Sequence, residues 1–310
     1  MLGSPDLVPQ YRNSACAPGG SHHPECSMRR LLLVTALILG SVLVSATVVR
    51  AQEREQTEAA APIQDNSFLV EEAYNQERGV VQHVGTFARA PEPGSWVYTL
   101  TQEWPVAGQR HQLSYTLPLA HATMASGGRT GIGDVALSYR YQILGVGGGA
   151  IALAPRATLL LPTGSSSRGL GRGGAGIETN LPFSAELPAS LVVHSNMGAT
   201  YTPRARDHLG NTAATLDYTL AQSVVWHALP RLDLMLEAAW TRAQEVSGPN
   251  RVARSTEALL APGIRAAFDF ASGLQIVPGL AFPIGVGPSS GERSVFVYLS
   301  FEHPFTNQTQ

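Results

Sequence analysis

The stretch GIGDVALSYRYQIL, residues 131–144, alternates apolar and polar side chains. Its apolar positions include Val135, Leu137 and Tyr139, whereas Asp134 and Arg140 have the opposite parity. A period of two predicts a β-strand with one apolar face and one polar face. A soluble sheet would bury the apolar face, and a membrane barrel would turn it towards lipid. The rest of the chain decides between these two arrangements.

The same alternation recurs from residue 80 onward. It predicts twelve strands, at about residues 80–88, 95–104, 110–118, 132–144, 150–161, 175–186, 189–201, 214–228, 231–243, 255–269, 273–284 and 293–305. A tilted strand needs about 9–11 residues to cross a bilayer, whereas strands of soluble proteins average about 5–6. The predicted lengths therefore favour an all-β fold, a transmembrane antiparallel up-and-down β-barrel of about 12 strands.

The connections between these strands alternate in length. Short connections such as VAGQR and GVGGG alternate with longer ones over residues 120–131, 162–174, 202–211, 243–254 and 286–293. Short turns at one end and long loops at the other are typical of a barrel in the bacterial outer membrane. An even number of strands leaves both termini on the periplasmic side.

Composition argues against several other classes of protein. Of the 310 residues, 14% are charged and 44% are hydrophobic, and the formal net charge is −2. This balance is unlike that of a disordered chain or of a protein built only from membrane helices. The small net charge gives no electrostatic reason to expect a nucleic-acid partner.

One long apolar run, residues 31–49, follows Met28, Arg29 and Arg30 and precedes Ala51. This order predicts a signal peptide over residues 28–51, with an uncleaved membrane anchor as the alternative. Residues 1–27 are then an upstream extension that translation from Met28 would omit, and they include Cys16. We expect a periplasmic tether over 52–79, whose residues 68–79 form a short helix or a lead-in strand. The barrel then covers 80–305, and 306–310 form a C-terminal tail.

All four tryptophans share the parity of the apolar residues. Trp96 and Trp104 are separated by about 26 Å of extended chain, which is about 20 Å along the membrane normal at the usual strand tilt. With Trp226 and Trp240 they predict two aromatic belts at the membrane interfaces. The alternative is a set of core tryptophans in a secreted β-sandwich.

Ionisable residues recur in the middle of the strands, on the polar face. We predict that they line the barrel lumen: Asp134, Arg140, Arg156, Glu178, Asp217, Asp233, Glu237, Glu257, Arg265 and Asp269. Because acidic residues outnumber arginines in this set, a passage between them would mildly prefer cations or neutral solutes. The alternative is that these charges only brace the barrel wall.

Two short motifs match patterns for dinucleotide binding and for catalysis, but their surroundings do not fit either function. GLGRGG, residues 169–174, matches a dinucleotide-binding pattern, but a strand follows it where that pattern requires a helix. His194 and Ser195 are adjacent on a strand and therefore point to opposite faces, so they cannot form a nucleophile and base pair. We expect no catalytic residues, no metal site and no cofactor. A barrel-type membrane enzyme, or a surface-binding barrel without a conducting pore, is the alternative function.

The last predicted strand places Val295, Val297, Leu299, Phe301 and Phe305 in one register. This is similar to the C-terminal signal by which outer-membrane proteins engage the barrel-assembly machinery, although TNQTQ follows Phe305 here. The partners expected from the sequence are this machinery, outer-membrane lipid and a small-molecule solute.

Three stretches together resemble a known family. FLVEEAYNQERGVVQH (68–83), GIGDVALSYRYQIL (131–144) and APRATLLLPTGSSSRGLGRGGAGIETNLPFS (154–184) resemble the phenol-degradation meta-pathway family of outer-membrane transporters. The resemblance implies a β-barrel that passes small, often hydrophobic or aromatic, compounds across the outer membrane. It implies no catalytic residues.

Overall fold

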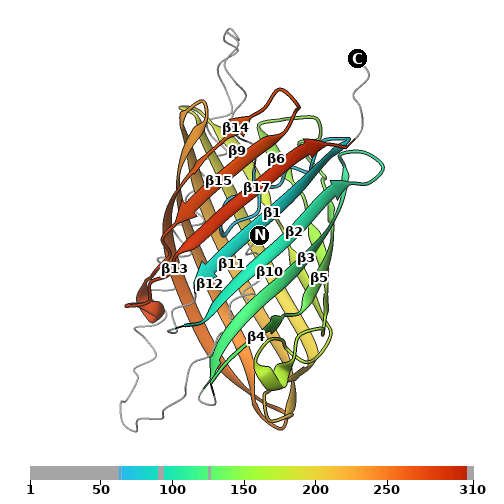
Figure 1. Ribbon diagram of the computed structural model, residues 1–310, viewed down its shortest axis with the longest axis vertical. Helices are drawn as coiled ribbons and strands as arrows, with labels where there is room; N and C mark the ends of the chain where they lie inside the picture. The colour runs from blue at the N-terminus through green and yellow to red at the C-terminus, as the bar shows by residue number, and fades with distance from the viewer. Residues whose placement is uncertain (1–62, 64, 90–93, 125–126, 306–310) are drawn as a thin grey trace. The chain divides into compact units, whose positions relative to one another are not determined.

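The computed structural model describes residues 63, 65–89, 94–124 and 127–305. These residues form a closed antiparallel β-barrel (Figure 1). Its strand segments are β1 (Val80–Arg89), β2 (Trp96–Pro105), β3 (His111–Met124), β4 (Gly127–Ile132), β5 (Val135–Tyr141), β6 (Ile151–Leu153), β7 (Arg156–Leu161), β8 (Gly176–Asn180), β9 (Phe183–Leu187), β10 (Leu191–Arg206), β11 (Thr212–Leu229), β12 (Leu232–Gly248), β13 (Arg251–Ala266), β14 (Phe268–Asp269), β15 (Gln275–Ala281), β16 (Ile284–Gly285) and β17 (Phe296–Pro304).

Twelve strands make up the barrel wall, as the sequence predicts. Five pairs of consecutive segments each continue one strand across a short break: β4 with β5, β6 with β7, β8 with β9, β13 with β14, and β15 with β16. The wall closes because β1 pairs with both the second strand and the last one. Gly85 lies opposite Leu100 of β2 on one side and Leu299 of β17 on the other. Closure leaves no sheet edge to be hydrated inside the bilayer.

The apolar face of the sheet points outward. In β5, Leu137 and Tyr139 are 45% and 41% exposed, whereas Arg140 is 2% exposed. A protein that folds in water has the reverse order. An apolar exterior around a polar interior is the arrangement of a membrane barrel, and it settles the orientation of the strand in residues 131–144.

The four tryptophans lie on this outward face, where each is partly or largely exposed. Trp96 stacks on His121 of β3 at a ring separation of 6.0 Å, and Trp104 contacts Tyr115 edge-on at 5.9 Å. One ring therefore lies towards each end of β2. That the tryptophans form belts at the two membrane interfaces stays a prediction.

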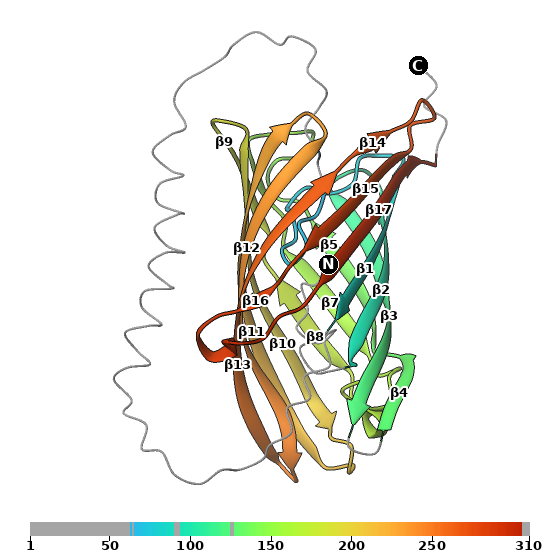
Figure 2. The same ribbon diagram turned by 60° about the vertical axis from the view of Figure 1, so that its left-hand side comes forward.

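Three of the predicted long loops are instead extended hairpins. β3 and β4 stay paired as far as Met124 and Gly127, β10 and β11 as far as Arg206 and Thr212, and β12 and β13 pair up to the turn at Asn250. Strands β10 to β13 therefore reach 16–18 residues and extend beyond their neighbours at the lower end of the view in Figure 2. Polar side chains in these stretches resemble a loop, but outside the membrane both faces of a strand can be polar.

Two of the predicted loops are confirmed as irregular connections. The connection between β7 and β8 contains the short 3-10 helix η2 (Ser166–Arg168), and that between β16 and β17 contains η3 (Gly287–Ser289). The predicted upstream extension, signal peptide and C-terminal tail lie outside the described residues. Among the residues that are described, no helix has the length and apolarity needed to cross a membrane.

Candidate functional site: a chain segment inside the lumen

The described residues before β1 lie inside the barrel (Figure 2). Phe68, Val70 and Glu71 have at most 2% of their surface exposed, and residues 65–76 are buried throughout. The stretch expected to be a short helix or a lead-in strand is neither; residues 63–79, named the luminal segment below, have no helix or strand where they are described, apart from the turn into β1. The barrel interior therefore holds a segment of the same chain that carries both apolar and polar side chains.

Side chains of the wall bind the backbone of the luminal segment. Its N–H groups donate to acceptors on five parts of the wall: Leu69 to both oxygens of Glu237 on β12 (3.1 Å), Glu71 to Asn196 on β10 (2.8 Å), Ala73 to Ser184 on β9 (2.8 Å), Asn75 to Gln142 just after β5 (3.0 Å) and Gln76 to Gln112 on β3 (2.8 Å). These bonds replace the partner strand that an extended chain would otherwise need. They hold the segment across the lumen from β12 to β3.

Asp65 anchors the beginning of the segment. Its carboxylate accepts hydrogen bonds from Gln82 on β1 (2.6 Å) and from Tyr298 and Ser300 on β17 (2.6 and 2.5 Å). Arg265 on β13 donates to the carbonyl oxygens of Asp65 and Asn66, at 2.6 and 2.9 Å. The donors come from both sides of the seam between the first and last strands.

Arg265 also pairs with Asp233 of β12 through Nε, at 2.7 Å. Both side chains are almost fully buried, so each depends on the other and on the carbonyl groups of the segment. The wall and the luminal segment thus share one charge network.

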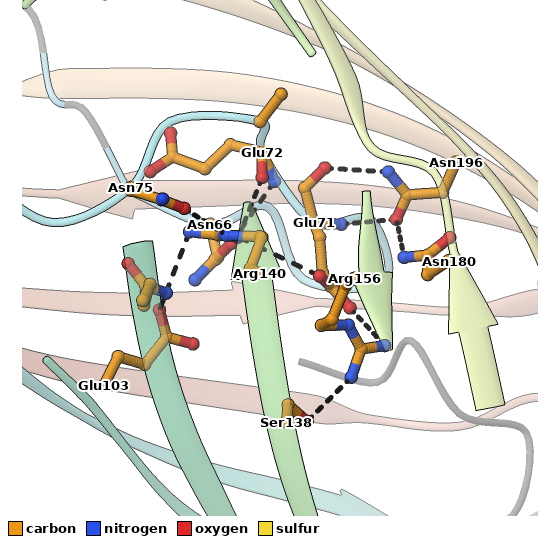
Figure 3. A network of polar contacts seen from close by, with 12 residues as sticks. Asn66, Glu71, Glu72, Asn75, Glu103, Ser138, Arg140, Arg156, Asn180 and Asn196 are labelled. Atoms are coloured by element: carbon orange, nitrogen blue, oxygen red, sulfur yellow. Dashed lines mark hydrogen bonds and ion pairs between the residues drawn. The ribbon is translucent and has the colours of Figure 1, made fainter. Parts of the chain in front are cut away.

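Two more arginines bind the middle of the segment (Figure 3). Arg140 donates to the Asn75 side chain and to the carbonyl of Tyr74, both at 2.7 Å, and to the carbonyl of Glu72 at 3.0 Å. Arg156 Nη2 lies 2.7 Å from Glu71 and 2.5 Å from Glu178 of β8. Because neither Glu71 oxygen has an aligned hydrogen-bond donor, the contact of Glu71 with Arg156 is mainly ionic.

Phe68 seats the segment against two glycines of the wall. Its ring packs at 5.8 Å from Phe296 and 5.7 Å from Tyr298. A Cβ at Gly263 or at Gly279 would come within 2.4 Å of this ring. The absence of side chains at these two positions creates the space that Phe68 fills.

Most of the predicted lumen-lining residues lie in this interior. Seven of them are buried on the inner face: Arg140, Arg156, Glu178, Asp217, Asp233, Glu237 and Arg265. Asp134 lies at the break between β4 and β5, where it accepts hydrogen bonds from the N–H groups of Gly164 and Arg172 at 2.9 and 2.7 Å. It therefore fixes the connection between β7 and β8.

Two predicted residues differ from this set. Glu257 is only partly buried, on the part of β13 beyond the belt. Asp269 has the inward parity but lies at the end of its strand, where it is exposed and pairs with Arg231 at 3.3 Å. Asp269 is therefore not among the buried interior charges, because parity alone does not reveal that a residue has reached the rim.

Four interior residues are not among those predicted from the sequence: Asp65, Glu71, Glu103 and Arg172. Glu103 precedes Trp104 on β2 and has the opposite parity, so the period of two could have identified it; its carboxylate accepts a hydrogen bond from Gln112 at 2.5 Å. Arg172, which is part of the GLGRGG motif, reaches back into the barrel and pairs with Asp217 at 2.5 Å. Asp65 and Glu71 belong to a segment without periodicity, which gave no signal.

One serine–histidine pair lies in this interior. Ser184 lies 2.7 Å from Nδ1 of His194, but the serine oxygen also accepts the N–H of Ala73, so the pair supports the luminal segment. No group of three or more potential metal ligands occurs among the described residues.

Comparison with known proteins identifies the fold. No family model and no curated protein matches the chain. The COG4313 outer membrane channel from Pseudomonas putida F1 is 14% identical, with a TM-score of 0.57 over 74% of this chain and 97% of that one. The NanC porin, at 8% identity, covers 72% of this chain and 98% of its own with a TM-score of 0.47. The first of these likenesses establishes an outer-membrane β-barrel, and this fold places the protein in the bacterial outer membrane.

Proposed function

We propose that the protein is an outer-membrane channel for the passive passage of small solutes, and that the luminal segment sets its size limit. The observation that carries the proposal is the closed wall with a polar inner face, on which Arg140, Arg156 and Arg265 all contact the segment. A barrel that served only as a membrane anchor would not need buried charges, because they are costly unless paired.

Small aromatic solutes with a polar edge are the class to test first. The resemblance of residues 68–83, 131–144 and 154–184 to the phenol-degradation family implies hydrophobic or aromatic compounds. The lumen offers amide, hydroxyl and carboxylate groups that would bind a polar edge, and its acidic groups favour cations or neutral molecules over anions.

The proposal is tested by conductance of the purified full chain in planar bilayers under a KCl gradient. We expect discrete current steps and a reversal potential of the sign that indicates a preference for K⁺. Uptake by liposomes of neutral, cationic and anionic aromatic compounds of equal size then ranks the solutes.

The opposite outcome has a definite meaning. If the protein migrates as a folded, heat-modifiable barrel, yet gives neither current steps nor uptake of any solute, the channel proposal is wrong. A surface-binding barrel without a pore would then be the better interpretation.

A further inference from the structure

An outward-facing pair of arginines lies on the hairpin of β12 and β13. Arg242 and Arg254 are both exposed. Thr241 and Ala243, which flank Arg242, are buried, so Arg242 has the outward parity of Trp240. Gln244 shares that parity and lies opposite Arg254, which places Arg254 on the same outer face.

This pair lies just beyond the apolar band. Arg242 is two residues from Trp240, which is about 7 Å along the strand and about 5 Å along the membrane normal for a tilted strand. The start of β1 and the end of β17, Val80 and Pro304, pair with each other at the opposite end of the barrel. With the termini on the periplasmic side, the arginines stand at the headgroup level of the outer leaflet.

Neither guanidinium has a protein partner among the described residues, in contrast to Arg231 and Arg265. Arg231, at the other rim, pairs with Asp269, and Arg265 in the lumen pairs with Asp233. Unpaired guanidinium groups beside a membrane surface are free to bind phosphate, with which they form short, bidentate hydrogen bonds.

The two side chains can reach one ligand. Arg242 lies directly opposite Thr256, and Arg254 is two residues further along the same strand. Such diagonal neighbours are about 7–8 Å apart at the backbone, a separation that two long arginine side chains span easily. Thr256, which is opposite Arg242 and two residues from Arg254, shares their parity and offers a hydroxyl group as an additional donor.

We propose that Arg242 and Arg254 bind a phosphate group of the anionic glycolipid in the outer leaflet, with Thr256 as a third contact. The site is on the outer surface, so it is independent of any passage through the lumen. It would fix the height of the barrel in the membrane and hold the protruding hairpin against the lipid surface.

The test compares binding of purified lipopolysaccharide to the full chain and to the R242Q/R254Q double variant in detergent. We expect the double variant to bind about tenfold more weakly, as the loss of charge-assisted hydrogen bonds implies. Arg251 is exposed on the same hairpin but has the opposite parity, so R251Q is the matched control and should bind like the unaltered chain.

Two further arms identify the ligand group. Enzymatically dephosphorylated lipopolysaccharide should bind the unaltered chain as weakly as intact lipopolysaccharide binds the double variant, and phosphatidylethanolamine should not compete. All variants must show the same heat-modifiable migration, which establishes that the barrel is folded. Equal binding by the double variant and the unaltered chain, or undiminished binding of the dephosphorylated lipid, would overturn the proposal.

Discussion

On β12, Leu234 and Leu236 are 40% and 53% exposed, while Asp233 and Glu237, one residue away from each, are fully buried. The outer face is solvated by lipid and needs no specific partner. The inner face requires a partner for every charge, which Arg265 provides for Asp233 and the backbone N–H of Leu69 provides for Glu237. Alternation along one strand therefore produces two different kinds of surface. The outer one is stabilised by contact with lipid, and the inner one is stabilised by specific ion pairs and hydrogen bonds.

The largest effect should follow the loss of an inner partner. Arg265→Ala would leave Asp233 buried without its cation and would free the carbonyl groups of Asp65 and Asn66. We expect a loss of about 3–5 kcal/mol in the free energy of unfolding, measured by urea titration in lipid vesicles. Arg231→Ala, which breaks an exposed pair at the rim, is the control and should cost at most about 1 kcal/mol. Similar costs for the two variants would contradict the comparison.

A charge placed on the outer face should be the next most damaging. Leu236→Arg introduces a cation facing lipid within the apolar band, at an expected cost of about 2–4 kcal/mol near the midplane. Val246 has the same parity but lies beyond Trp240, so Val246→Arg should be nearly neutral. The measurement is the folded fraction on a heat-modifiability gel as urea rises. If both variants fold equally well, the outer face does not contact lipid.

A weaker effect on stability, and a clearer one on conductance, is expected at the anchor of the luminal segment. Asp65→Ala removes the acceptor of Gln82, Tyr298 and Ser300. Stability should fall by about 1–3 kcal/mol because buried donors lose their acceptor. Single-channel conductance should rise as the start of the segment is released. A conductance identical to that of the unaltered chain would show that Asp65 does not restrain the lumen.

The smallest expected change is in ion selectivity. Arg140→Ala and Arg156→Ala each remove one positive charge from the lumen, so each should shift the reversal potential towards stronger cation preference. Arg231→Ala, outside the lumen, should leave it unchanged. Reversal potentials that do not move in either luminal variant would count against a passage beside these residues.

The sequence predicts the strands and their two faces because a period of two requires only local information. It predicts the hairpins at the long-loop end poorly: TPRARDHLGN contains Pro203 and charges, yet β10 continues into it as far as Arg206, with a register shift between Thr202 and Ala205. Outside the membrane no apolar parity remains to mark a strand.

The luminal segment could not be derived from local pattern at all. Its backbone is satisfied by residues far away in the chain, from Gln109, which is 34 positions from Asn75, to Arg265, which is 200 positions from Asp65. The order of its apolar and polar side chains shows neither the period of a helix nor that of a strand. Only the closed barrel brings these partners together, so the position of the segment follows from the tertiary fold.

The central claim, that residues 65–76 lie inside the barrel, is tested most directly by a disulfide. Ser67 Oγ lies 2.9 Å from Ser223 Oγ on β11. In a chain whose Cys16 and Cys26 are replaced by serine, Ser67→Cys together with Ser223→Cys should form a disulfide in the oxidising periplasm. Mass spectrometry of protease fragments should find the two peptides linked, and single variants should give none. Two free thiols in the folded, heat-modifiable double variant after treatment with oxidant would contradict the account.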